Sequence, residues 1–184
     1  MEENYSQNKW SKGATEGLYL SLVAVVCGLV SQFIANTLSK EGNSSLGFSI
    51  LSIAIWIAQT VGSIWLLSKF MKKYRTETGE KSMGYGTIVC LFSSIVCAIW
   101  SFACYQWIFP DMAQQVSETF ESLRGMMEGL PASTLDKMID NFGQYMCITT
   151  FFKSFLFGVI AAAIISSSQQ PKDIFADNGQ DELL

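Results

Sequence analysis

Long apolar segments alternate with polar stretches along the chain. An α-helix of about 20 apolar residues crosses a hydrocarbon core ~30 Å thick. The segments that reach this length cover about residues 17–38, 46–67, 85–109 and 145–166. The first three of them contain no charged residue. The pattern therefore predicts an all-α polytopic membrane protein, whose four transmembrane helices lie in a membrane domain at residues 17–168, after an N-terminal tail at 1–16.

The fourth segment differs from the others because Lys153 interrupts it. The apolar run that follows, from Phe155 to Ile165, is too short to cross a bilayer alone. A span results if Lys153 lies in the outer third and its long stem carries the ammonium to the interface. We therefore interpret Lys153 as an interfacial anchor.

The sequence of the insert at residues 110–144, between the third and fourth spans, predicts an amphipathic helical hairpin. In its first half apolar residues recur at spacings of three and four: Met112, Val116, Phe120, Leu123 and Met127. Pro131 breaks this helix, and Ser133 with Asp136 resembles a capping box for a second one. The hairpin would lie on the outer surface or cap the bundle. The polar, acidic residues 169–184 predict a disordered tail.

The basic residues indicate the orientation. One side of the predicted topology carries Lys9, Lys12, Lys69, Lys72, Lys73, Arg75, Lys81 and Lys172. The other side carries only Lys40, Arg124, Lys137 and the boundary residue Lys153. Because positive residues stay cytoplasmic, both termini are expected inside the cell. The group Lys69, Lys72, Lys73 and Arg75, beside the second span, would also contact anionic lipid head groups.

Composition narrows the functional classes. The net charge of −4 gives no basic excess for nucleic-acid binding. The chain has no histidine, which removes the commonest general base and zinc ligand. Five cysteines lie in apolar stretches without a CxxC pair, so neither a disulfide framework nor a zinc site is indicated. No nucleotide-binding or hydrolase motif occurs, and we predict no catalytic, cofactor or metal site.

Several short motifs follow one another along the chain, and each occurs once. They are Lys72-Lys73-Tyr74-Arg75, a glycine turn at Gly79, Met83-Gly84-Tyr85-Gly86 at the start of the third span, and Phe109-Pro110-Asp111 at its end. With the amphipathic insert and final span that follow, nearly the whole chain resembles the domain of unknown function 4199 (DUF4199) family, small four-span membrane proteins typical of Bacteroidetes. The resemblance implies a bacterial inner membrane and brings no catalytic residues.

Small residues within the spans have two interpretations each. Cys90, Cys97 and Cys104 share one face of the third span. They could form a soft-metal or redox path, but without a neighbouring methionine or histidine we favour a packing seam. The small-xxx-small pairs Ala24/Gly28 and Gly158/Ala162 indicate either contacts in a homo-oligomer or, as we favour, packing within the bundle.

Polar groups near the spans are also ambiguous. Gln32, Gln59 with Thr60, and Gln106 could line a solute path or hydrogen-bond between helices. No acidic residue lies at mid-membrane to couple transport to ions. The insert carries Asp111, Glu118, Glu121, Glu128, Asp136 and Asp140, which we interpret as a solvated face rather than a catalytic carboxylate pair.

Three functional classes follow. The leading hypothesis is a non-enzymatic structural or accessory subunit that contacts a membrane-protein partner through its helices and hairpin. The second is a small channel or transporter subunit that self-associates to form a pore. The third, least favoured, is a membrane enzyme that uses the outer carboxylates. All three place the chain in the lipid bilayer.

Overall fold

A computed structural model describes residues 2–40, 45–109 and 141–169 of the chain. These residues form helices α1 (Glu2–Lys40), α2 (Ser45–Thr78), α3 (Met83–Ala103) with its π-helical continuation η1 (Cys104–Ile108), and α6 (Phe142–Ser168). The described part of the chain contains no strand. Four stretches are long and apolar enough to cross a membrane: Asn8–Ile34, Ile50–Thr78, Met83–Ile108 and Phe142–Ser168. The predicted all-α fold with four candidate spans is confirmed, and it indicates a multi-pass membrane protein.

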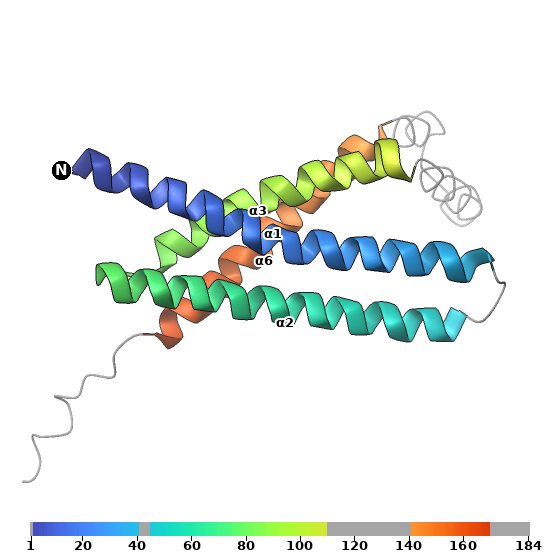
Figure 1. Cartoon of the computed structure of the whole chain (residues 1–184), viewed down its shortest axis with the longest axis horizontal. Helices are drawn as coiled ribbons and strands as arrows, with labels where there is room; N and C mark the ends of the chain where they lie inside the picture. Colours follow the sequence, from blue (N-terminus) through green and yellow to red (C-terminus); the bar gives the residue numbers. More distant parts are fainter. Residues whose placement is uncertain (1, 41–44, 110–140, 170–184) are drawn as a thin grey trace, which may run out of the picture.

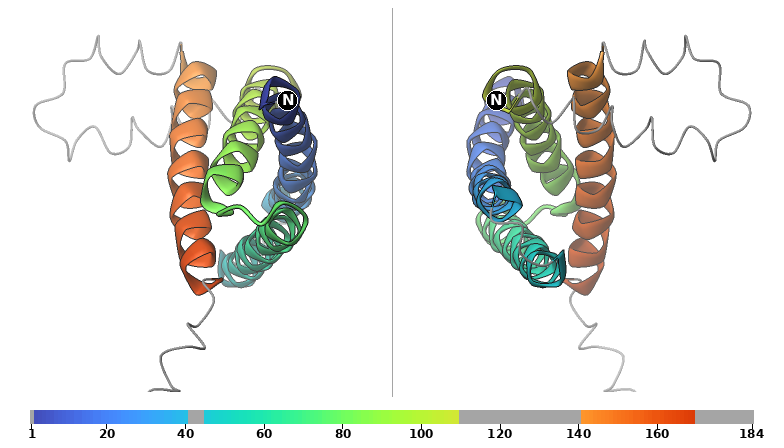
Figure 2. Two further views of the ribbon diagram at one scale, coloured as in Figure 1. Left: turned by 90° about the vertical axis from the view of Figure 1, so that its left-hand side faces the viewer. Right: turned by 90° about the vertical axis from the view of Figure 1, so that its right-hand side faces the viewer.

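The helices form two antiparallel pairs that cross each other, α1 with α2 and α3 with α6 (Figure 1). Helix α3 is central, because both α1 and α6 pack along it, whereas α2 packs mainly on α1 and touches α3 and α6 little. Viewed from the end, α3 lies between α6 and α1 (Figure 2). The start of α1, the end of α2, the start of α3 and the end of α6 all lie at one end of the bundle (Figure 1).

Two glycines of α1 allow close contact with α3. A Cβ atom at Gly13 would lie 2.6 Å from Ile88 Cγ2. One at Gly17 would lie 2.7 Å from Phe92 Cβ and 2.8 Å from the carbonyl oxygen of Val89. Such separations leave no room for any side chain, so hydrogen alone fits. Gly13-x-x-x-Gly17 is a GxxxG pattern, a known signal for close helix approach that our sequence analysis did not use.

The contact of α3 with α6 also depends on small residues. A Cβ atom at Gly86 would lie 3.0 Å from Ala162 Cβ and 2.7 Å from the sulfur of Met71. One at Gly158 would lie 2.8 Å from Cys90 Sγ. The surrounding buried core comprises Leu20, Leu67, Met71, Tyr74, Tyr85, Val89, Cys90, Ala161, Ala162 and Ile165. The small residues Gly86, Gly158 and Ala162 let α3 and α6 approach closely.

The helices are longer than the predicted spans. Helix α1 has 39 residues and begins at Glu2, within the predicted tail, and α2 continues past Leu67 to Thr78. At 1.5 Å per residue α1 is about 58 Å long, nearly twice the thickness of a hydrocarbon core. Loss of apolar residues therefore marks the membrane edge and not the helix end. Helix α6 likewise begins at Phe142, inside the predicted insert.

Helix α3 and its continuation η1 end at Ile108, close to the residue at which the sequence predicts the end of the third span. Its last turn widens into the π-helical residues of η1, and Phe109 leaves the helix with φ −132° and ψ 61°. The residue before a proline is disfavoured in the α conformation, and Pro110 follows. The predicted hairpin within residues 110–140, with its capping box and carboxylates, and the predicted disordered tail from residue 170 lie outside the described residues.

We predict that Gly17→Ala destabilises the bundle by about 1–3 kcal/mol, because the added methyl group meets the α3 backbone and forces α1 outward. The measurement is thermal unfolding of the purified protein in mild detergent. Gly28→Ala is the matched control: no atom lies within 4 Å of the Cβ position at Gly28, so its melting temperature should stay level or rise. Equal melting temperatures for the two variants would contradict this packing.

Candidate functional site

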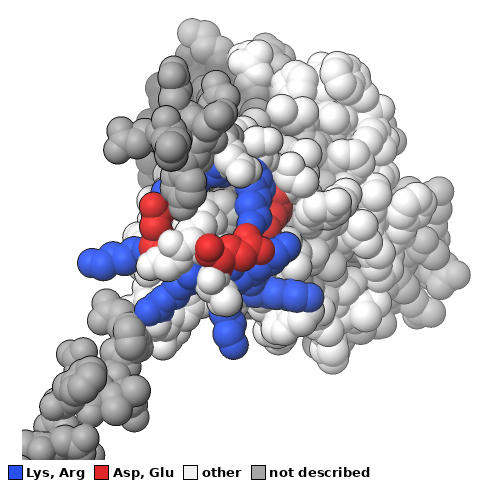
Figure 3. All heavy atoms as spheres, turned by 60° about the vertical axis from the view of Figure 1, so that its left-hand side comes forward, with Lys and Arg blue, Asp and Glu red and all other residues white. Residues whose placement is uncertain are grey.

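Charged residues gather at the end of the bundle that holds the start of α1 (Figure 3). Lys12 of α1 forms an ion pair with Glu77 in the last turn of α2. Lys9 lies 3.8 Å from Glu80, in the connection between α2 and α3. Because these pairs are partly exposed, each contributes little to stability. These ion pairs connect α1 to the last turn of α2 and to the residues that follow it.

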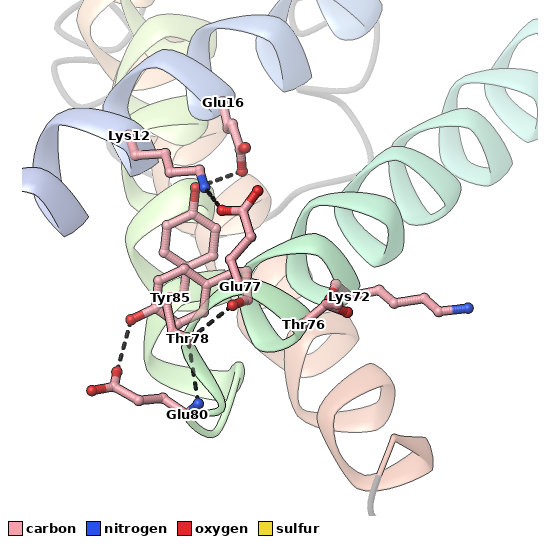
Figure 4. A network of polar contacts seen from close by, with 9 residues as sticks. Lys12, Glu16, Lys72, Thr76, Glu77, Thr78, Glu80 and Tyr85 are labelled. Carbon is pink, nitrogen blue, oxygen red and sulfur yellow. Dashed lines mark hydrogen bonds and ion pairs between the residues drawn. The ribbon is translucent and has the colours of Figure 1, made fainter.

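A buried hydrogen bond lies beside these ion pairs (Figure 4). The hydroxyl of Tyr85 in α3 donates to Glu16 Oε2 in α1 across 2.5 Å. Tyr85 is fully buried and Glu16 is 7% exposed. Burying a carboxylate costs free energy unless it is hydrogen-bonded. The hydrogen bond from Tyr85 therefore offsets part of the cost of burying Glu16.

Aromatic stacking extends this contact to α2. The rings of Tyr85 and Tyr74 are stacked, with centroids 4.1 Å apart and planes inclined by 4°. The Tyr74 hydroxyl donates to Glu80 across 2.7 Å. We call the chain Glu16–Tyr85–Tyr74–Glu80 the polar ladder. It links α1, α3, α2 and the α2–α3 connection, and it places two motif tyrosines at its centre.

The connection between α2 and α3 is held in place by local hydrogen bonds. Gly79 has φ +73°, a conformation that favours glycine, and its N–H donates to the carbonyl of Arg75 across 2.8 Å. The Glu80 N–H donates to the Thr78 hydroxyl. Ser82, which is buried, donates to Gln169 Oε1 at the end of α6. This turn therefore sets the position of Glu80 in the polar ladder.

The basic cluster predicted to contact lipid lies on α2 close to the same end. Lys69, Lys72 and Lys73 are exposed, and Arg75 is half-buried. The Lys69 ammonium lies 5.3 Å from the ring centroid of Trp65, and Lys72 points away from the polar contacts (Figure 4). Exposed cations beside an apolar helix are well placed for anionic head groups, and lipid contact at these residues stays a prediction.

A groove with some polar lining runs between the helices farther along the bundle. Its volume is about 370 Å³. All four long helices contribute to its lining: Leu20, Ala24, Trp56, Gln59, Thr60, Ser63, Ile64, Leu67, Ser93, Cys97, Thr150, Lys153, Ser154, Phe157, Gly158 and Ala161. We call this cavity the α2–α6 groove, because most of its lining comes from those two helices. Its volume falls in the ~300–1,000 Å³ range of small-molecule sites.

The structure separates some residues that the sequence grouped together. Of the three cysteines on the third span, Cys97 lines the groove, whereas Cys90 packs on Gly158 and Cys104 is buried at the start of η1. Of the three glutamines considered in the sequence, only Gln59 lines the groove. Gln106 lies beside Gly143, in the first turn of α6. The described residues contain no group of three or more side chains suited to a metal ion.

Two pairings could not be read from the sequence. The bond between Glu16 and Tyr85 joins residues 69 positions apart, and Lys153 shares the groove with Gln59 although the two lie on different helices. The only signal for the first was an acidic residue directly before an apolar span. For the second it was a lysine within one. Neither signal identifies a partner.

Comparison with known families identifies one match. The sequence profile of the family described as "Protein of unknown function (DUF4199)" matches residues 15–167, which is most of the chain. The chain belongs to this family, and the predicted resemblance is confirmed. No curated protein and no solved structure matches it. The matched range contains the polar ladder and every residue of the α2–α6 groove.

We predict that Tyr85→Phe lowers the free energy of unfolding by about 1–3 kcal/mol, because it leaves the Glu16 carboxylate buried without its donor. Glu16→Gln should cost less, since an amide oxygen still accepts. A double-mutant cycle on thermal unfolding in mild detergent measures the coupling.

Thr87→Val serves as the control for this cycle. It also removes a hydroxyl from α3, but one that bonds only to the carbonyl of Met83 on its own helix. Additive effects of the changes at Tyr85 and Glu16 would show that the hydrogen bond between them does not stabilise the bundle.

Proposed function

We propose that this DUF4199 protein is a non-enzymatic accessory or structural subunit of a bacterial inner membrane, acting through contacts of its helices with a membrane-protein partner. The observation that carries the proposal is Gly28, within the candidate span of α1. Among the described residues, nothing lies within 4 Å of a Cβ placed there. A glycine weakens a helix by about 1 kcal/mol, and in membranes small residues allow another helix to approach closely.

Other glycines of the bundle support this interpretation by contrast. Gly13 and Gly17 face α3, and Gly158 faces Cys90, so each of them has a neighbour within the chain. A partner helix seated at Gly28 would give this glycine the same packing role that the others have inside the bundle.

The proposed orientation places both termini in the cytoplasm. The described ends of the chain share one end of the bundle, where exposed lysines of α2 gather (Figures 1 and 3). Positive residues near span ends are retained in the cytoplasm, and this end carries most of them. The connection between η1 and α6 would then face the periplasm.

A channel or transporter subunit acting as a homo-oligomer is the second candidate. The α2–α6 groove favours it, because the groove brings Gln59, Thr60 and Ser63 together with Lys153 between apolar helices. Polar side chains that line a cavity at membrane depth mark solute pathways in many membrane proteins. A groove in a single copy is not a closed pore, so a second copy would be needed to complete one.

We expect in-cell crosslinking, mild-detergent capture of the tagged protein and mass spectrometry to recover one stoichiometric membrane partner. Gly28→Leu should reduce its recovery several-fold, because the larger side chain holds the partner helix away. Gly28→Ser is the matched control and should retain the partner, since a small side chain preserves close approach. Recovery of self-crosslinked species alone would reject the accessory role in favour of the homo-oligomer.

Reporter fusions test the orientation. An enzyme that is active only outside the cytoplasm should be inactive when fused after Arg75 and active when fused after Glu128, because the two positions follow an even and an odd number of spans. A reporter active only in the cytoplasm provides the reciprocal control. The reversed pattern of activities would place both termini outside.

A further inference from the structure

Lys153, which is exposed on α6, borders the α2–α6 groove. In a bilayer it would lie at a depth where cations are costly. Lys153 lies about 16 Å along α6 from Phe142 and about 22 Å from Ser168, at ~1.5 Å per residue. If α6 is centred on a ~30 Å hydrocarbon core, Lys153 lies about 11 Å inside its boundary. That depth exceeds the reach of a four-carbon stem, so snorkelling alone does not solvate the ammonium.

Lys153 has no counter-ion in the described part of the chain. The ion pairs there join Lys9 to Glu80 and Lys12 to Glu77, at the charged end of the bundle. The groove lining itself contains no acidic residue. An intramembrane cation is stabilised by an opposite charge or by hydrogen bonds, and here neither comes from the described residues. The charge of the groove therefore selects an anion.

Further donors line the groove with Lys153. The hydroxyl of Thr60 is already bonded to the carbonyl of Trp56, and that of Thr150 to Ser101. No hydrogen bond to another described residue engages the side chains of Gln59, Ser63 or Ser154. An amide and two hydroxyls beside an ammonium form a set of donors that suits the oxygens of a carboxylate or phosphate.

The remaining walls of the groove are apolar. Trp56, Ile64 and Phe157 line it, together with Leu20 and Leu67. Trp56 is 60% exposed and Phe157 is 48% exposed, so these rings border the open side, where α2 and α6 make few contacts. In a bilayer this side faces lipid. An occupant that enters there needs an apolar part as well as an anionic one.

We propose that the α2–α6 groove binds an anionic amphiphile, either a fatty carboxylate or an anionic phospholipid. Its head-group oxygens pair with the Lys153 ammonium and accept hydrogen bonds from Gln59, Ser63 and Ser154. Its alkyl chain leaves between α2 and α6 along Trp56 and Phe157. At about 30 Å³ per water, the groove has the volume of a dozen waters, so it accommodates a head group with adjoining methylenes.

The proposal concerns the purified chain and does not depend on the accessory role. Binding to the groove needs no partner protein, whereas the accessory role needs no ligand. A binding measurement on the isolated full-length protein therefore tests the ligand alone. In-cell crosslinking tests the partner alone. A negative result in one of these two experiments therefore does not affect the conclusion from the other.

The test is native mass spectrometry of the full-length protein released from mild detergent, titrated in separate arms with palmitate, phosphatidylglycerol, hexadecanol and inorganic phosphate. We expect one molecule of palmitate or phosphatidylglycerol to bind per chain, with hexadecanol and inorganic phosphate binding far more weakly. Lys153→Gln should weaken binding about tenfold or more, because it removes a charge-assisted contact. Lys153→Arg should retain binding within a few-fold.

Two further variants complete the design. Lys81→Gln removes an exposed cation from the connection between α2 and α3, outside the basic cluster, and it should leave the one-to-one binding unchanged. Ser154→Leu fills the groove while keeping the charge, and it should also weaken binding, which preserves the test if Lys153→Gln does not fold. Equal affinity of the wild type and both groove variants would overturn the proposal. So would inorganic phosphate that binds as tightly as the amphiphiles.

Discussion

Helices inside a bilayer gain little from hydrophobic burial against one another, because lipid is as apolar as their side chains. Close contact at α3 is therefore the constraint on which the rest of this bundle depends. Hydrogen atoms at Gly13 and Gly17 let α1 approach the backbone of α3, and Gly86 and Gly158 do the same for α6. Helix α2 meets α3 where Met71 packs on Gly86 and Tyr74 stacks on Tyr85, but elsewhere it touches α3 and α6 little, and the groove opens beside it.

Polar side chains are used in two different ways in this molecule. At the charged end, Glu16 and Tyr85 satisfy each other, and stacking on Tyr74 extends the contact to α2. Because these contacts are made within the chain, they connect α1, α3 and α2 at this end of the bundle. In the α2–α6 groove, Lys153 and Gln59 border an open space. Internally satisfied groups hold a structure together, whereas polar groups around a cavity are available to a ligand.

Several of the motif residues through which the chain resembles the DUF4199 family lie at packing contacts and turns of this structure. The motif residues Tyr74 and Tyr85 stack on each other, Gly79 forms the left-handed turn between α2 and α3, and Gly86 receives Met71 and Ala162. Each of these residues takes part in a packing contact or a turn of the fold. The groove residues were not part of the recognised motifs.

The sequence by itself determined the all-α class, the four candidate spans, the end of the third span before Pro110 and the family. A hydrocarbon solvent imposes length and composition on each segment separately, so those properties are local and can be read along the chain. Helix ends were not determined in this way: α1 begins at Glu2, within the polar stretch before the first span, where Lys12 pairs with Glu77 of α2 and Gly13 packs on α3. Only the tertiary structure decided that Tyr85 meets Glu16, that Gly28 has no neighbour in the described residues and that Lys153 borders the same groove as Gln59. Each of these depends on which helices lie side by side and at what rotation, and a pattern of apolar residues leaves both undetermined.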